Sequence, residues 1–132
     1  MIDTNKALVE ILQGNGPLLA LVPASRIMAG TLQEGTEFPA ISFSTVGGTT
    51  DLHLPVLNPR VQIRCWHDTD PEVARQVYRA VHDALYGLRN QTLSGSEFLV
   101  ETEEVVQGQD LVDPQSGYKS VLSFWRLSFH KD

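Results

Sequence analysis

The order of apolar and polar residues along the chain predicts two helical regions. Residues 4–12 place apolar side chains three and four positions apart, as one face of a short helix does, and Thr4 is positioned to cap it. The apolar run at 17–22 is expected to add one or two helical turns. Residues 70–88 form the clearest helix, because an apolar stripe recurs along them and Asp70 can cap their start.

Four further segments alternate between apolar and polar residues, as half-buried strands do. They cover residues 38–46, 60–66, 98–106 and 118–129, and the last two are separated by turn-forming residues at 113–117. The side chains expected to face the core from the first two strands are Ile41, Phe43, Val61, Ile63 and Cys65. The pattern therefore predicts an α+β fold with a single mixed or antiparallel sheet of about four strands and helices packed on one face.

Composition narrows the class of protein. The chain has 132 residues, of which 42% are hydrophobic and 20% charged, so we expect one globular domain over residues 1–132. Disorder, collagen and coiled coil are excluded by this balance. No apolar run is long enough to span a membrane, and the first residues do not resemble a signal peptide. We therefore expect an intracellular protein without a membrane contact, and the single cysteine excludes an intrachain disulfide.

The residue types that carry chemistry do not form a recognisable site. His67, Asp68 and Asp70 cluster in sequence, but adjacent side chains point apart, and the two aspartates are better placed to start the following helix. Cys65 shares its strand face with apolar residues, where a thiol is inert. Gly47-Gly48 lacks the remaining glycines and the lysine of a phosphate-binding loop. We expect no catalytic residue, no metal and no cofactor.

The charges point to contacts between proteins. The net charge of −6 opposes direct binding of nucleic acid, which needs a basic surface. Six acids and no base lie between residues 97 and 113, whereas arginines are concentrated between residues 60 and 90. The candidate contact residues are Arg60, Arg64, Glu101 and Glu103. They either pair across strands of the same chain or join two copies head to tail, an arrangement that closes into rings.

A second candidate for partner contact is the segment between the first two predicted strands. Residues 47–59 form a predicted loop of thirteen residues, longer than hairpin loops usually are, and its middle is apolar. The segment either folds back on the core of its own chain or meets a partner protein, because exposed apolar patches mark interaction sites. The residues in question are Leu52, His53, Leu54, Val56 and Leu57.

The order of these segments resembles the phage tail terminator and tail-to-head joining (tail completion) proteins. The resemblance rests on Phe-Pro-Ala-Ile-Ser-Phe at 38–43, on the strand Arg-Val-Gln-Ile-Arg-Cys-Trp at 60–66, on the helix through 74–85 and on the closing strand at 118–127. It implies a structural virion protein that forms a hexameric ring, caps the finished tail tube and docks it to the head connector or stopper. By the same analogy, the segment at 47–59 would face the tube or its lumen.

Two other functions stay open at this stage. Within the same class, the chain could be another head–tail connector component, such as a stopper, or a minor tail protein. In a different class, it could be a small-ligand-binding or enzymatic α+β domain that uses His53, His67 and neighbouring acids. A pocket of converging polar groups with strongly shifted pKa values would favour that second reading.

Overall fold

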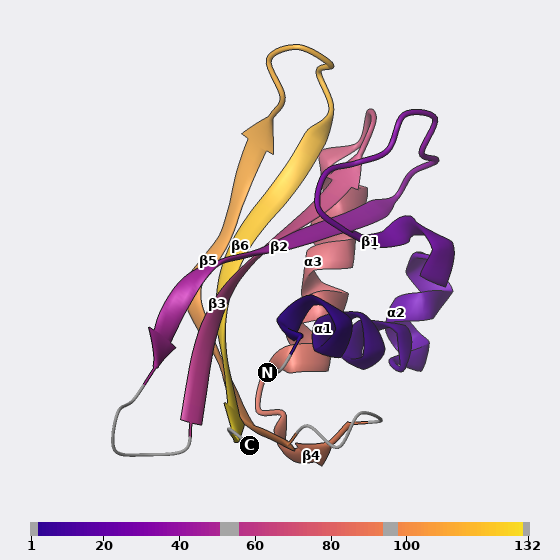
Figure 1. Cartoon of the computed structure of the whole chain (residues 1–132). Helices are drawn as coiled ribbons and strands as arrows, with labels where there is room; N and C mark the ends of the chain where they lie inside the picture. The colour runs from indigo at the N-terminus through magenta and orange to yellow at the C-terminus, as the bar shows by residue number, and fades with distance from the viewer. Residues whose placement is uncertain (1–2, 51–55, 94–97, 131–132) are drawn as a thin grey trace.

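The fold is one curled sheet with three helices against its inner face (Figure 1). The computed structural model describes residues 3–50, 56–93 and 98–130. The helices are α1 (Thr4–Gln13), α2 (Gly16–Leu21) and α3 (Pro71–Leu85), with a short 3₁₀ turn at Ala24–Arg26. The strands are β1 (Ile27–Ala29), β2 (Ala40–Thr50), β3 (Val56–His67), β4 (Arg89–Thr92), β5 (Phe98–Val112) and β6 (Lys119–His130).

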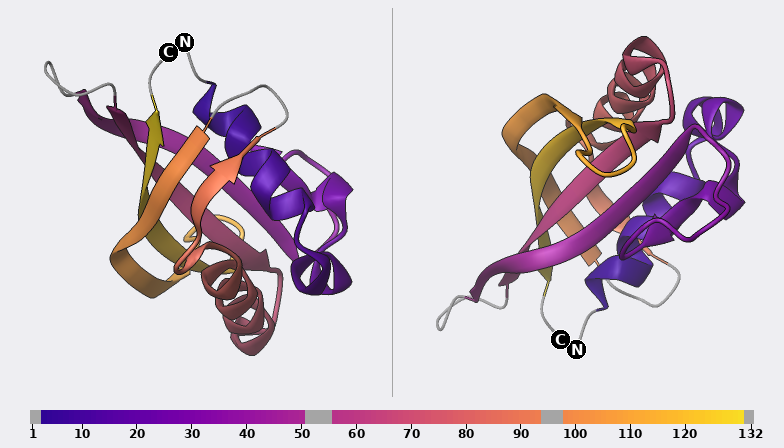
Figure 2. Two further views of the ribbon diagram at one scale, coloured as in Figure 1. Left: turned by 90° about the horizontal axis from the view of Figure 1, so that it is seen from below. Right: turned by 90° about the horizontal axis from the view of Figure 1, so that it is seen from above.

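The sheet has six strands in the order β1-β2-β3-β6-β5-β4, so the expectation of about four strands was wrong. β1 lies parallel to β2, and the other neighbours are antiparallel, which makes the sheet mixed, one of the two arrangements expected. Figure 2 shows that the sheet wraps around the helices, and that the β2–β3 hairpin extends away from the body of the molecule.

The core lies between the inner face of the sheet and the helices, as the alternation predicted. Ile41 and Phe43 of β2 and Val61, Ile63 and Cys65 of β3 are buried there. β6 adds Trp125 and α3 adds Val77 and Val81 to the same cluster. Each of these side chains leaves water almost completely, which is worth roughly 1.5–3 kcal/mol for a residue of this size. Among the described residues, no helix has the length and apolar character needed to cross a membrane.

The helix starts follow capping chemistry. Asp70 accepts the backbone N–H of Glu72 at 2.9 Å and caps α3, as predicted. Pro71 occupies the first turn of the helix. At α1 the cap is Asp3, which accepts the N–H of Lys6, and not Thr4, which is already helical. α3 ends at Leu85, three residues earlier than predicted.

The described residues of the predicted loop at 47–59 belong to strands, so that prediction was wrong. β2 continues to Thr50, β3 starts at Val56, and Thr50 is paired with Leu57. The pairing shifts between Thr45 and Gly48, and such a bulge breaks the alternation by which strands are recognised. Gly48 is required there, because a Cβ on it would lie 2.7 Å from the Cα of Pro59.

The sequence pattern also missed two strands and ended β5 too early. β1 has three residues, and all four residues of the polar strand β4 are exposed, so neither carries an alternating signal. β5 continues six residues past its predicted end at Val106, because register shifts around Val106 bring a second stretch of the strand against β6. Both missed strands lie at the outer edges of the sheet.

Candidate functional site

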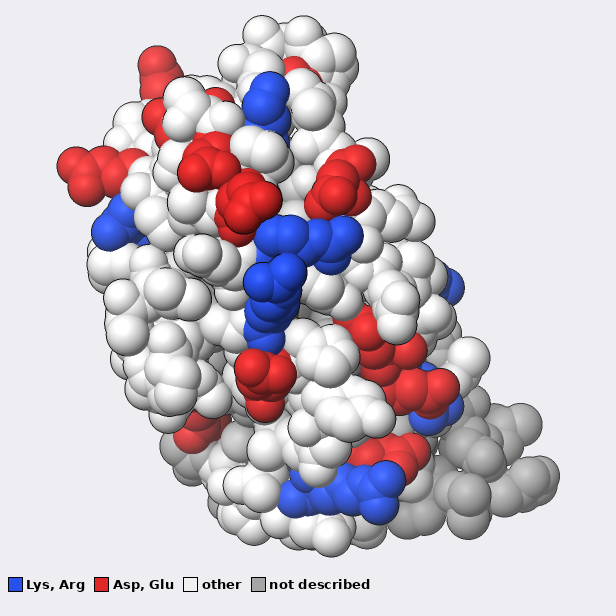
Figure 3. All heavy atoms as spheres, turned by 180° about the vertical axis from the view of Figure 1, so that it is seen from behind, with Lys and Arg blue, Asp and Glu red and all other residues white. Residues whose placement is uncertain are grey.

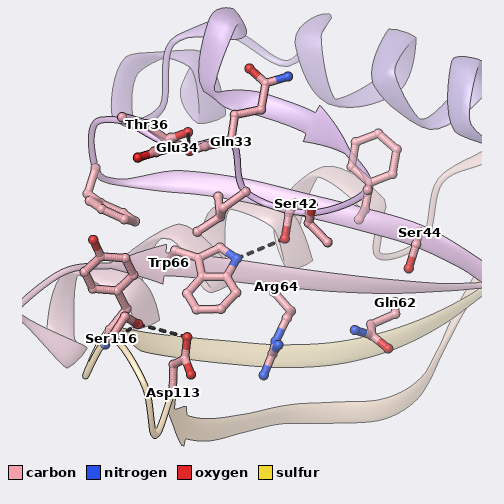
Figure 4. A pocket seen from close by; sticks show the side chains of 17 residues that line it. Gln33, Glu34, Thr36, Ser42, Ser44, Gln62, Arg64, Trp66, Asp113 and Ser116 are labelled. Carbon is pink, nitrogen blue, oxygen red and sulfur yellow. Dashed lines mark hydrogen bonds between the residues drawn. The ribbon is translucent and has the colours of Figure 1, made fainter.

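A groove lies on the outer face of the sheet, away from the helices (Figure 4). It has a volume of about 670 Å³. Its floor comes from the outward-facing residues of β2 and β3, and its walls are the segment at 30–36 and the turn between β5 and β6. Outward positions alternate with core positions along each strand, so the same pattern that builds the core also places Ser42, Arg64 and Trp66 in the groove.

Trp66 and Arg64 form the centre of the groove. The indole Nε1–H of Trp66 donates to the hydroxyl of Ser42 at 2.9 Å, which fixes the ring against β2. The guanidinium carbon of Arg64 lies 4.8 Å from the centre of this ring, within the range of a cation–π contact. Among the described residues, the buried Nε of Arg64 has no hydrogen-bond partner.

The turn at one end of the groove is organised by Asp113. Its carboxylate accepts the backbone N–H of Gln115 at 3.1 Å and the hydroxyl of Ser116 at 2.9 Å, and these bonds lower the pKa of Asp113. Phe38 and Tyr118 meet edge to face beside it, with ring centres 4.8 Å apart. Aromatic walls and an arginine with unused donor capacity suit an extended polypeptide with a polar or carboxylate group.

The acids and arginines singled out in the sequence find partners within the chain. Arg126 of β6 lies opposite Glu103 of β5 in the register and contacts it, and it also lies 3.5 Å from Glu101. Arg60 lies over the ring of Phe124, 4.9 Å from its centre. Arg60 and Arg64 therefore lie on the same outer face as Glu101 and Glu103. The residue that contacts both acids, however, is Arg126, on the strand between β3 and β5.

Surface charge is mixed on the side of the molecule shown in Figure 3, where basic side chains are surrounded by acidic ones. Two polar contacts of Arg75 connect α3 to β5. Arg75 lies 3.4 Å from Asp110, and it donates to the carbonyl of Gly108 at 3.4 Å. This face offers no wide basic area of the kind that phosphate backbones need.

The apolar candidates fall into two groups. Leu52, His53 and Leu54 lie outside the described residues. Val56 and Leu57 are half-buried in β3, opposite His130 and Phe129 of β6, and Leu57 packs against the core.

The residues that suggested catalysis or metal binding have structural surroundings. His67 accepts the backbone N–H of Asp70 at 2.8 Å through Nδ1, so it helps to start α3. Cys65 is completely buried in the core, and burial raises the pKa of its thiol. Within the described ranges, no three histidine, cysteine or acidic side chains are placed to hold a metal ion. The residues that line the groove include no histidine and no cysteine.

A second polar cluster joins α3 to β5. The hydroxyl of Tyr78 donates to the carboxylate of Glu104 at 2.5 Å and accepts the backbone N–H of Gly108 at 3.0 Å. The Glu104 side chain is only 8% exposed, and His82 lies 3.7 Å from it. Burial, followed by the bond to Glu104, raises the pKa of Tyr78.

Two features of the outer face were missed from the sequence. Arg126 lies on the same side of β6 as Leu122 and Phe124, and the alternation of the predicted strand could have placed it between Arg60 and Glu103. The segment at 30–36, which walls the groove, carries no periodic signal at all. Its position follows from tertiary packing.

The fold and the groove define a small α+β protein whose outer surface is suited to contacts with other protein chains. Comparison with known families identifies it more closely. Residues 6–125 match the family model of tail completion protein gp17. The match covers most of the chain, which therefore belongs to the tail completion protein gp17 family and is a structural component of the phage tail.

Solved structures agree on the fold. A chain in the virion of a native gene transfer agent particle superposes with a TM-score of 0.76 at 18% identity, covering 96% of this chain and 93% of that one. The gp17 protein of bacteriophage SPP1 gives a TM-score of 0.54 at 18% identity, covering 96% and 87%. No curated protein sequence matches significantly.

Proposed function

We propose that this chain is a tail terminator: copies of it form a hexameric ring that caps the finished tail tube and joins it to the head connector. The observation that carries the proposal is the family match over residues 6–125. A chain with this fold in an assembled gene transfer agent virion also supports an assembly role. The role is structural and works through occupancy, so it needs no turnover and no cofactor.

The protruding β2–β3 hairpin is our candidate for the contact with the tail tube protein. β2 and β3 pair up to Thr50 and Leu57, and the hairpin reaches beyond the body of the sheet (Figure 2). Its residues 51–55 include the apolar candidates Leu52 and Leu54. Paired strands that extend away from the body can hold a partner-binding segment outside the core.

The ring is tested by measuring the mass of the purified chain by light scattering at high concentration and low salt, with and without tail tube protein. We expect the mass of a hexamer and ring-shaped particles in negative-stain images. A chain that stays monomeric under all of these conditions would contradict the proposal.

The arm is tested by a double variant, Leu52→Ser with Leu54→Ser. We expect an unchanged melting temperature and an unchanged ring, because the proposal places both leucines outside the core, but weaker binding to purified tail tubes in a sedimentation assay. Glu37→Ser, an exposed position in a segment away from the arm, is the control. Loss of the fold in the double variant would place both leucines in the core and exclude them from the contact.

A further inference from the structure

The two outermost strands are too short to cover the strands beside them. β1 is paired only with Ile41–Phe43 of β2, and β4 only with the stretch of β5 from Phe98 to Glu101. Within the described part of the chain, residues 44–50 of β2 and 102–112 of β5 therefore have a neighbouring strand on one side only. The sheet ends in a partly open edge on both sides.

At the β5 edge, backbone N–H and carbonyl groups point out of the sheet. The N–H of Asp113 donates to the carbonyl of Tyr118 at 2.9 Å, so Asp113 faces β6. Backbone groups alternate in direction along an antiparallel strand, and those of Asp110 and Val112 consequently point away from β6. Gly108 fits the same alternation, because its outward N–H and carbonyl bind Tyr78 and Arg75.

α3 therefore covers the β5 edge at Gly108, and beyond it the Arg75 side chain reaches only the carboxylate of Asp110, 3.4 Å away. Two and four residues further on, at Asp110 and Val112, no strand of the described chain lies alongside. Outward N–H and carbonyl groups in a regular strand are a template for another strand.

Exposed apolar side chains mark the same two edges. The described residues include five large hydrophobic side chains that are exposed, and three of them lie on the open segments. Val46 of β2 is 43% exposed, and Val105 and Val112 of β5 are 44% and 58% exposed. Apolar side chains on an open strand edge favour pairing with a further chain.

We propose that neighbouring copies in the ring join by strand addition, with the open edge of β5 in one copy beside the open edge of β2 in the next. This inference rests on the proposed ring. The two edges are different surfaces of one chain, so the contact is head to tail, as a closed ring requires. β2 and β5 run antiparallel within the chain, so a neighbour in the same orientation gives an antiparallel pair.

The geometry also sets an offset between neighbours. The open parts of β2 and β5 lie towards opposite ends of the sheet, because each begins where its short edge strand stops. Pairing these open parts shifts each copy along the strand direction relative to its neighbour. A closed ring accommodates such a shift when its strands are tilted, as the strands of a barrel are. The contact covers Val46, Val105 and Val112. Because it consists of backbone bonds and apolar side chains, its strength should change little with salt.

The inference is tested with Val46→Lys and Val112→Lys, measured by native mass spectrometry over a concentration series. A lysine on an open edge blocks strand addition, so each variant should need at least about tenfold more protein for half of the chains to enter rings. Tyr86→Lys is the control, because Tyr86 is 71% exposed at the end of α3, outside both edges. Circular dichroism should show the same fold for all three variants.

A mixture of the two edge variants identifies which edges meet. Each variant keeps one usable edge, so mixing them should produce a species of two chains, one of each variant, and nothing larger. Self-association of Val46→Lys into dimers would show that β5 pairs with β5 and would overturn the assignment of β2. A further variant, Val112→Pro, removes an N–H that points outward and leaves the bonds to β6. It should therefore also prevent rings.

The outcomes separate this inference from the proposed function. Wild-type rings with unchanged midpoints for Val46→Lys, Val112→Lys and Val112→Pro would overturn strand addition and leave the ring in place. A wild-type chain that stays monomeric at high concentration and in the presence of tail tube would overturn the ring itself.

Discussion

Replacing Gly108 by alanine should lower the free energy of unfolding by about 2–4 kcal/mol. A Cβ at this position would lie 2.6 Å from Cγ1 of Val121 and 2.8 Å from Cζ of Tyr78. The Tyr78 ring would have to move, and its bonds to Glu104 and to the Gly108 N–H would be lost. The nearly buried Glu104 carboxylate would then lose its shortest contact. Urea denaturation followed by circular dichroism measures the change.

Two controls assign this cost to the contact with Tyr78. Gly16→Ala should change stability by no more than about 0.5 kcal/mol, because a Cβ on Gly16 meets nothing within 4 Å. In a double-mutant cycle with Tyr78→Ala, the Gly108→Ala change should cost at least about 1 kcal/mol less than in the parent chain. Equal stability of Gly108→Ala and the parent would mean that α3 does not close against β5 as described.

The core-facing elements could be predicted from sequence, because apolar residues recur in them at the regular spacing of a strand or a helix. Residues 60–66 alternate cleanly, and β3 buries Val61, Ile63 and Cys65 as expected. Asp70 and Pro71 define the start of α3 through local capping, which does not depend on the rest of the fold. These signals arise from neighbours in sequence, so one sequence is enough to detect them.

The outer features could not be predicted, because they depend on pairings between distant segments. All residues of β4 are exposed, and the segment is a strand only because it pairs with β5, with Gln91 opposite Leu99. The bulge after Thr45 and the proline at position 59 make the long hairpin look like a loop. The groove brings the segment at 30–36 against Trp66 and Asp113, which are far apart in the chain.

The charged candidates illustrate the same limit. The sequence suggested pairing of Arg60 or Arg64 with the acids of the later strand, yet β6 lies between β3 and β5. Arg126 on β6 is therefore the residue that reaches Glu101 and Glu103. Strand order, which periodicity does not contain, decides which charges meet.

The largest effect on the phage should come from removing this chain altogether. Without a terminator, we expect heads and tails that do not join and tail tubes of irregular or excessive length, visible by electron microscopy of lysates. The yield of infectious particles should fall to background, because an unjoined tail cannot deliver the genome. Normal-length tails joined to heads would contradict the terminator function.

Adding back a variant that lacks three of the four histidines separates structural capping from catalysis. His53→Asn, His67→Asn and His82→Gln together should restore joining almost as well as the parent chain, and a chelator should have no effect, since capping needs neither proton transfer nor a metal. His67→Asn keeps an oxygen that can accept the Asp70 N–H. Loss of capping in a variant that still folds and forms rings would favour the ligand-binding alternative.

The most direct measurement is a titration of purified rings onto tail tubes isolated from phage that lack this chain. Negative-stain images count the capped tube ends at each ratio of rings to ends. The account predicts that capped ends increase linearly with added rings and reach a plateau at one ring per tube end. Termination of many tubes by each ring, or rings that never locate at tube ends, would contradict it.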